Sequence, residues 1–227
     1  MAVDFWKVVW EQRSRIIAML TREEEMNRSL SLPQTKCHCY WPSTPYQTTA
    51  YGPLKVTLLT ETRLTVSSSE DVIIIRQLTI SHTSSPAGTS ARIITHLQYT
   101  GWCLITPSDA LRERVCGGPA REGIDAATAA KDTEVSPMIV HCSAGCGRSG
   151  AFCTIDTVMR KMAGLDRLDG GEGTKTDDEE QEEARRATEA EGVVDLLYET
   201  VERFREQRVS MVQTLRQYVF CYEAVMW

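Results

Sequence analysis

A cysteine, a run of small residues and an arginine stand together in VHCSAGCGRSGAF, residues 140–152. The apolar residues up to His141 predict a buried strand, and we expect a helix to begin near Ser149. The two glycines between them let the loop amides turn inward, so that the loop forms an anion nest at the positive end of the helix. Because such a nest stabilises negative charge on sulfur, the sequence predicts that Cys142 is a thiolate at neutral pH.

Arg148 and Ser149 extend this chemistry. The planar guanidinium of Arg148 can hold two phosphoryl oxygens at once, and the Ser149 hydroxyl could stabilise the sulfur when it leaves. Together these residues indicate attack of a thiolate on phosphorus, with a thiophosphate intermediate. A buried cysteine before a tight turn is the simpler alternative. The spacing Cys-x5-Arg alone is a weak signal for this chemistry. The full segment HCSAGCGRSG, between an apolar strand and a helix with periodic apolar residues, is a specific one.

The elements expected to position this loop are mostly strands before it and helices after it. The Val-, Ile- and Thr-rich segments around the polar turn SSSED predict antiparallel strands, and apolar residues at helical spacing predict the helices. Together they indicate one α/β domain with a mixed sheet. The expected strands are 15–20, 54–66, 71–82, 91–99 and 137–141; the expected helices are 4–13, with Asp4 as its N-cap, 193–208, with Val193, Leu197, Val201 and Phe204 on one face, and 214–227, with Tyr218, Tyr222 and Val225 on one face.

Bulk properties limit the class of protein. The chain has 227 residues and a net charge of -6, which argues against nucleic acid and anionic membranes as partners. We expect no membrane span and no signal peptide, and eight cysteines then indicate free thiols in a reducing, cytoplasmic setting. Residues 166–191 are rich in acidic and poor in apolar residues, which predicts a solvated, disordered insertion, with a binding role as the alternative.

The segment KCHCYW, residues 36–41, places Cys37, His38 and Cys39 side by side. These three residues are too close together for a zinc site, and no second ligand pair follows at zinc-like spacing. We therefore expect no metal and no organic cofactor.

The loop and several further segments resemble one family, the tyrosine-specific protein phosphatases. DFWKVVWEQRSRIIAMLT, KCHCYWP, YGPLKVTLL, HLQYTGW and VQTLRQYVFCYEAV have counterparts there in the same order. The resemblance covers residues 1–227 except the acidic insertion. It implies a single protein-tyrosine-phosphatase-like α/β domain with a twisted mixed sheet flanked by helices. It also implies that the protein is a monomer that acts on phosphotyrosine-containing proteins.

The resemblance also implies roles for individual residues. Cys142 would be the nucleophile, and His141 would tune its thiol. Gln213 would position the hydrolytic water with help from Gln217. Phosphate would be held by Ser143, Ala144, Gly145, Cys146, Gly147 and Arg148.

The sequence departs from the family at the loop that carries Trp-Pro-Asp, whose aspartate is the general acid. Trp102 is present, but Cys103 and Leu104 follow it, and the loop is about one residue short before Pro107. General acid–base catalysis is typically worth about 10²–10⁴-fold in rate. Asp109 could substitute for the missing acid, although a helix cap is the simpler interpretation.

A second departure is at the amino terminus, where the family has more chain ahead of DFW, including a tyrosine that stacks on the substrate ring. We therefore expect an N-terminally truncated domain whose selectivity for phosphotyrosine over phosphoserine is open. Two functions follow: a slow phosphatase, or a binding module that holds phosphotyrosine and turns over negligibly. A thiol redox or sulfur-transfer protein fits less well, because it would not need Arg148.

Overall fold

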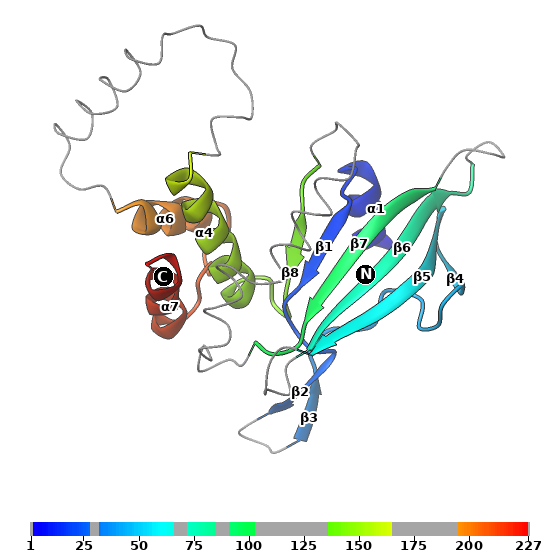
Figure 1. Cartoon of the computed structure of the whole chain (residues 1–227), viewed down its shortest axis with the longest axis horizontal. Coiled ribbons are helices and arrows are strands. Elements are labelled where there is room, and N and C mark those ends of the chain that lie inside the picture. The colour runs from blue at the N-terminus through cyan, green and yellow to red at the C-terminus, as the bar shows by residue number, and fades with distance from the viewer. Residues whose placement is uncertain are drawn as a thin grey trace, which may run out of the picture.

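A six-stranded mixed sheet forms the centre of the structure (Figure 1). This structure is a computed structural model that describes residues 2–27, 32–65, 72–84, 91–102, 136–164 and 195–226. The strand order is β4-β5-β6-β7-β1-β8. Its strands are β1 (Ile16–Met19), β4 (Thr48–Tyr51), β5 (Leu54–Thr65), β6 (Val72–His82), β7 (Arg92–Tyr99) and β8 (Ile139–His141).

The sheet has a parallel part and an antiparallel part. Strand β1 is parallel to both β7 and β8, whereas β4, β5, β6 and β7 pair antiparallel in order. The register of β5 and β6 shifts between Leu58 and Thr60. A separate antiparallel pair is formed by β2 (Glu24–Asn27) and β3 (Leu32–Thr35). The parallel strands bring the residue after β8 to one edge of the sheet, where the cysteine loop begins.

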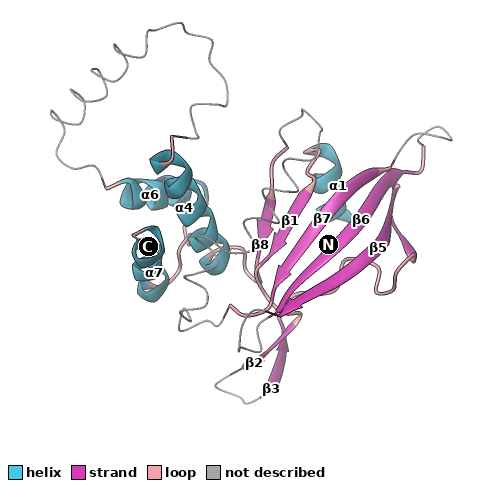
Figure 2. Ribbon diagram, in the orientation of Figure 1, coloured by secondary structure: helices cyan, strands magenta, loops and turns pink. Residues whose placement is uncertain are grey.

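Four described helices flank the sheet, and they fall into two groups (Figure 2). Helix α1 (Ala2–Glu11) lies against the sheet, and its Trp6 and Val9 are fully buried there. The others gather beside the end of β8 that bears the loop (Figure 1). They are α4 (Gly147–Met162), α6 (Leu196–Gln207) and α7 (Leu215–Val225). The predicted fold class, an α/β domain with a twisted mixed sheet flanked by helices, is confirmed.

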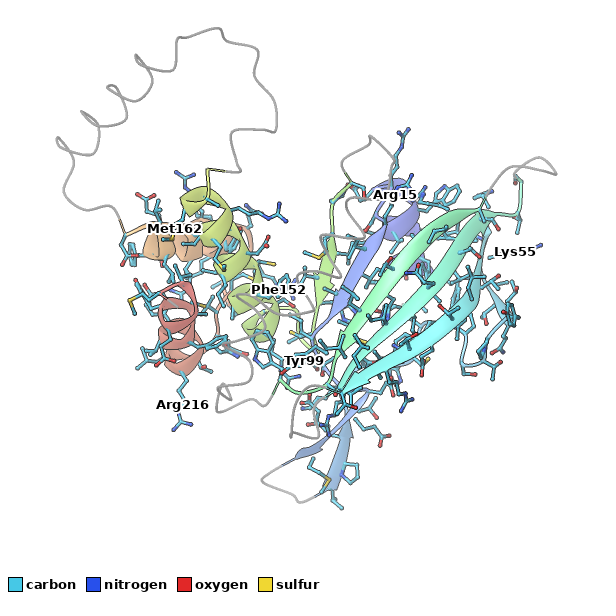
Figure 3. All side chains as sticks on the ribbon, viewed as in Figure 1. Arg15, Lys55, Tyr99, Phe152, Met162 and Arg216 are labelled. Atoms are coloured by element: carbon cyan, nitrogen blue, oxygen red, sulfur yellow. The ribbon has the colours of Figure 1, made fainter. Side chains whose placement is uncertain are left out.

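Two apolar clusters hold these layers together. One joins α1 to the sheet through residues such as Ile17, Leu54 and Leu78. The other joins α4, α6 and α7 through Ile155, Val201 and others. Tyr99 of β7 and Phe152 of α4 both pack against this second cluster, and their side chains lie where the helices meet the sheet (Figure 3).

Several local expectations need correction. Helix α1 already includes Ala2, so Asp4 lies in its first turn rather than at its N-cap, where a carboxylate still interacts favourably with the helix dipole. Helix α4 begins at Gly147, two residues earlier than expected. On α7 the buried face consists of Gln217, Phe220, Cys221 and Ala224, while the expected Tyr218, Tyr222 and Val225 are half-buried beside it.

Some expectations lie wholly or partly outside the described residues. The acidic stretch 166–191 and Val193 lie wholly outside them. Strands β2, β3 and β4 were not predicted, because each has only four residues and little apolar alternation. Within the described ranges, no helix is both long enough and apolar enough to cross a membrane.

Candidate active site

The nucleophile predicted from the sequence lies between the end of a strand and the start of a helix. Strand β8 ends at His141, Cys142 follows, and α4 starts at Gly147. Gly145 has φ of +67°, a left-handed conformation that glycine adopts without strain. The loop therefore closes around Cys142, whose side chain is buried with 8% of its surface exposed.

The thiol of Cys142 has a pKa below its ordinary value. Burial raises this pKa, but hydrogen bonds from the Ser149 hydroxyl and from the backbone amides of Ser149, Gly145 and Cys146 outweigh it. These donors stabilise the thiolate and not the thiol. The inward-facing amides expected from the two glycines are therefore present at the sulfur.

Ser149 lies in the first turn of α4 and is buried. Its hydroxyl makes no hydrogen bond of ordinary geometry to any described residue, yet it lies near enough to Cys142 to lower the pKa of that thiol. A buried hydroxyl without such a bond is costly. The Cys142 thiolate is the group this hydroxyl can serve, and the lowered thiol pKa reflects that contact.

Arg148 is buried and held by a residue that sequence reasoning missed. Its Nη1 and Nη2 donate to the two carboxylate oxygens of Glu25 at 2.5 and 2.7 Å, and Nη1 also donates to the carbonyl of Leu20 at 3.1 Å. A two-point contact of this kind fixes the plane of the guanidinium. Glu25 gave no signal because it is the third of three consecutive glutamates, and only the register of β2 selects it.

The pKa of Glu25 reports the same contact. Burial raises it, but hydrogen bonds and charge attraction from Arg148 prevail, and the pKa of this carboxyl lies below its ordinary value. Glu25 is therefore ionised while it holds Arg148. Whether the guanidinium also binds phosphate remains a prediction.

The segment before Gln213 is clamped onto the loop. The Val212 amide donates to the Cys146 carbonyl at 3.3 Å, and Arg205 donates to the carbonyls of Met211 and Val212. A Cβ on Gly150 would lie 2.5 Å from the Val212 nitrogen, so this approach requires glycine. The side chain of Gln213 is exposed next to the loop, and its role in positioning water remains a prediction.

Val212 has φ of 55°, which is strained for a β-branched residue. The surrounding hydrogen bonds and the close packing on Gly150 hold it there. This strain sets the direction in which the chain enters Gln213. No local sequence signal indicates it, because valine gives no hint of a left-handed conformation.

Gln217 lies beneath the loop rather than within reach of solvent. Its side chain accepts a hydrogen bond from the Thr214 amide in a capping box at the start of α7. Its amide group also packs on Gly147, where an added Cβ would approach within 2.7 Å. Gln217 therefore joins α7 to the start of α4, and its predicted assistance in hydrolysis is untested.

Arg208 is a second arginine at the loop that sequence reasoning missed. Its Nε donates to the sulfur of Cys146 at 3.0 Å, and its Nη2 donates to the Ala144 carbonyl at 2.8 Å. The residue follows α6, some 62 positions from Cys146. Its contacts brace the outer wall of the loop, on which Ser143 and Ala144 are exposed.

Two other expected residues adjoin the site. His141 lies at the end of β8, and its Nδ1 is 3.2 Å from the Cys142 carbonyl. Trp102 is buried edge-on against Phe220 of α7, with ring centroids 5.9 Å apart. Cys103, Leu104, Pro107 and Asp109 lie outside the described residues, so the position of a substitute acid stays a prediction.

The cysteine-rich segment before Tyr40 shows no features of a metal site. The sulfur of Cys37 contacts the carbonyl of His38, and burial raises the pKa of Cys37 to about 11. Across the ranges that the structure describes, no group of three or more histidine, cysteine or acidic side chains could hold a metal ion.

Comparison with known proteins decides the family. The family model described as protein-tyrosine phosphatase matches residues 1–172 and 182–227. The chain belongs to this family. The resemblance inferred from the loop and the flanking segments is thereby confirmed.

Two individual tyrosine phosphatases are similar to this chain over most of its length. Human receptor-type tyrosine-protein phosphatase alpha is 32% identical over 98% of this chain, which covers 22% of that protein. Tyrosine-protein phosphatase 2 of Dictyostelium discoideum is 34% identical over 98% of the chain, which covers 48% of it. The chain thus spans less than half the length of these relatives.

Proposed function

We propose that this chain hydrolyses phosphotyrosine in proteins through a cysteinyl-phosphate intermediate. The observation that carries the proposal is the buried Cys142, whose thiol pKa is lowered by loop amides and a hydroxyl despite its burial. A structural cysteine in the same degree of burial would have a raised pKa. The family membership supports the same chemistry.

In the first step the Cys142 sulfur forms a bond to phosphorus while the bond from phosphorus to the tyrosine oxygen breaks. The loop amides and the guanidinium of Arg148 would bind the equatorial oxygens, which carry most of the negative charge. Glu25 holds that guanidinium in one plane. The departing oxygen leaves with the bonding electron pair and, without the family's aspartate, takes its proton from solvent.

In the second step water attacks phosphorus and loses a proton to solvent, while the sulfur leaves with its bonding pair as a thiolate. The donors that lower the thiol pKa also make this sulfur a better leaving group, since they stabilise the charge that it regains. Gln213 would orient the water, because the strained Val212 directs the chain toward the loop at that point.

The residues after Trp102 limit the expected rate. Cys103 and Leu104 stand where the family has proline and the acidic aspartate, and the leucine at the aspartate's position has no proton to give. We therefore propose a phosphatase that is slow with poor leaving groups. The same observation favours a second candidate, a binding module that retains the phosphate pocket and turns over negligibly.

Two substrates separate the candidates. An aryl phosphate with a very acidic leaving group needs little protonation, whereas a phosphotyrosine peptide needs a proton. A slow phosphatase would hydrolyse the first readily and the second poorly. A binding module would hydrolyse neither and would still bind the peptide, and loss of both activity and binding would contradict both candidates.

Restoring the acid sharpens this test. The double substitution C103P/L104D should raise the rate with the peptide by up to about 10²–10⁴-fold, with little change for the acidic aryl phosphate. The matched control is C103P/L104N, which has the same shape without a proton to give. Equal effects of both variants on the peptide would show that an absent acid does not limit the rate.

A further inference from the structure

Four hydrogen bonds link a buried cation to the backbone of the nucleophile. Arg76 Nη1 is 3.2 Å from His96 Nδ1, and His96 Nε2 is 2.8 Å from the Tyr40 hydroxyl. That hydroxyl is 2.6 Å from His141 Nε2, and His141 Nδ1 is 3.2 Å from the Cys142 carbonyl. The chain draws its members from β6, β7, β8 and the segment before Trp41.

The two ends of this chain fix its direction. A guanidinium can only donate and a carbonyl can only accept. His96 Nδ1 must therefore accept from Arg76, so a neutral His96 has its proton on Nε2 and donates to Tyr40. Tyr40 then donates to His141 Nε2, which leaves the proton of a neutral His141 on Nδ1, facing the Cys142 carbonyl.

Burial keeps the start of the chain rigid. Arg76 is 3% exposed, and it is held by Glu61 at 2.8 Å and by Gln98 at 2.9 Å. Its guanidinium also lies 4.4 Å from the centre of the Trp41 ring. His96 is completely buried, so neither of its neighbours can be replaced by water without opening the core.

The charged and titratable groups around the chain oppose an added proton. His96 faces Arg76 and His141. Burial lowers the pKa of His96 well below its ordinary value, and the charge of Arg76 and the nearby His141 lower it further. Burial also lowers the pKa of His141, which packs against the Phe5 ring of α1.

Tyr40 has its own titratable neighbours. Burial raises its pKa well above the ordinary value, Cys37 and Cys39 raise it further, and Arg76 opposes them. The hydroxyl therefore keeps its proton at neutral pH and can donate it to His141 Nε2.

We propose that Arg76 and His96 are positioning residues that act through Tyr40 to hold His141 neutral, with its proton on Nδ1 and donated to the Cys142 carbonyl. The link to catalysis rests on the proposed phosphatase function. The direction of the chain does not, because it follows from the contacts alone.

The chain also explains why His141 resists protonation. A second proton on its Nε2 would require Tyr40 to accept from both histidines, and the Tyr40 proton would then have no partner in a buried site. If water took the place of the His96 ring, Tyr40 could donate its proton to that water and accept from a charged His141. His96 therefore controls the charge next to the nucleophile from two side chains away.

Nitrogen NMR on the unmodified protein tests the direction. The chain has four histidines, so their ring nitrogens can be assigned. We expect Nδ1 protonated and Nε2 unprotonated in His141, and the opposite pattern in His96, with no titration of either in the mildly acidic range. A proton on Nε2 of His141, or a charged His141 at neutral pH, would overturn the proposal.

The variant H96A tests the control, because water that enters the vacated space can accept the Tyr40 proton. The pKa of His141 should then rise from its lowered value, and kcat/KM for an acidic aryl phosphate should gain an inflection at the pH where His141 titrates. The matched control is H82A, which removes a histidine from the far end of β6 and should change neither. An unchanged His141 titration in folded H96A would overturn the proposal; if H96A does not fold, the measurement on the unmodified protein decides.

The two proposals can fail separately. An unmodified protein that shows the expected proton positions but hydrolyses neither substrate would count against the phosphatase function, while the hydrogen-bond chain would stand. Activity with the opposite proton positions would count against the chain alone.

Discussion

The loop at Cys142 and the helix pair α4–α7 both bury a cysteine, yet they shift its pKa in opposite directions. Cys142 is 8% exposed and has a lowered pKa. Cys221 is completely buried on α7, and burial raises its pKa to about 12. On α4, burial together with the nearby Asp156 and Cys142 raises the pKa of Cys153 to about 11.

The difference lies in the backbone. In a helix interior the amides are already bonded to carbonyls four residues earlier, so they have nothing to offer a thiolate. In the loop and the first turn of α4 the amides of Gly145, Cys146 and Ser149 point at sulfur instead. Burial alone therefore does not activate a cysteine, and unpaired donors are needed to reverse its effect.

The largest effect should come from exchanging the loop thiol. We expect C142S to reduce hydrolysis of the aryl phosphate by at least about 10⁴-fold, as removal of a nucleophile does elsewhere. The matched control is C221A, which removes the helix thiol and should retain the rate while losing about 1 kcal/mol of stability. Near-normal hydrolysis by C142S would refute the assigned nucleophile.

Replacing the planar guanidinium of Arg148 should have the next largest effect. R148K keeps the charge but cannot make the two-point contacts, so we expect kcat/KM to fall by about 10²–10³-fold. R160K, on the exposed side of the same helix, is the control, because within the described residues Arg160 forms its ion pair with Asp156 four residues earlier, away from the loop. Similar rates for the two variants would argue that Arg148 supports structure alone.

The ion pair under the loop predicts a pH-dependent stability. Since the pKa of Glu25 is lowered on folding, its contribution is present above the unfolded pKa, about 4.3, and is lost as the pH falls through the folded pKa. At neutral pH E25Q should lower the free energy of unfolding by about 3 kcal/mol, because it leaves a buried charge unpaired.

Denaturant unfolding at several pH values measures this difference between the wild type and E25Q. The difference should shrink as the solution is acidified. The control E24Q changes the neighbouring exposed glutamate of β2. A difference that stays constant with pH would mean that the Glu25 charge is unimportant.

The smallest expected effect is at Ser149. Its hydroxyl favours the thiolate, so S149A should raise the pKa of Cys142 by about one pH unit. The acid limb of kcat/KM would then move to higher pH after correction for ionisation of the substrate. An acid limb that does not move would leave the loop amides as the sole cause of the lowered pKa.

The elements around the site were predictable where contiguous residues carry the signal. Strands β5 and β6 followed from their Val-, Ile- and Thr-rich pattern, and the loop with its inward amides followed from its glycines. Glu25 and Arg208 could not be predicted, because they lie 123 and 62 positions from the loop residues that they contact. The strained φ of Val212 was equally hidden, since it depends on packing against Gly150.

The sequence by itself indicated the family, the order of the main elements and the residue types predicted to meet phosphate, because these are encoded in local spacing. Tertiary structure alone decided which glutamate holds Arg148 and which groups line up from Arg76 to Cys142. The physical reason is that a carboxylate or an imidazole is defined chemically by its neighbours, and those neighbours come together only when segments far apart in the sequence, such as β6, β7, β1 and β8, are paired.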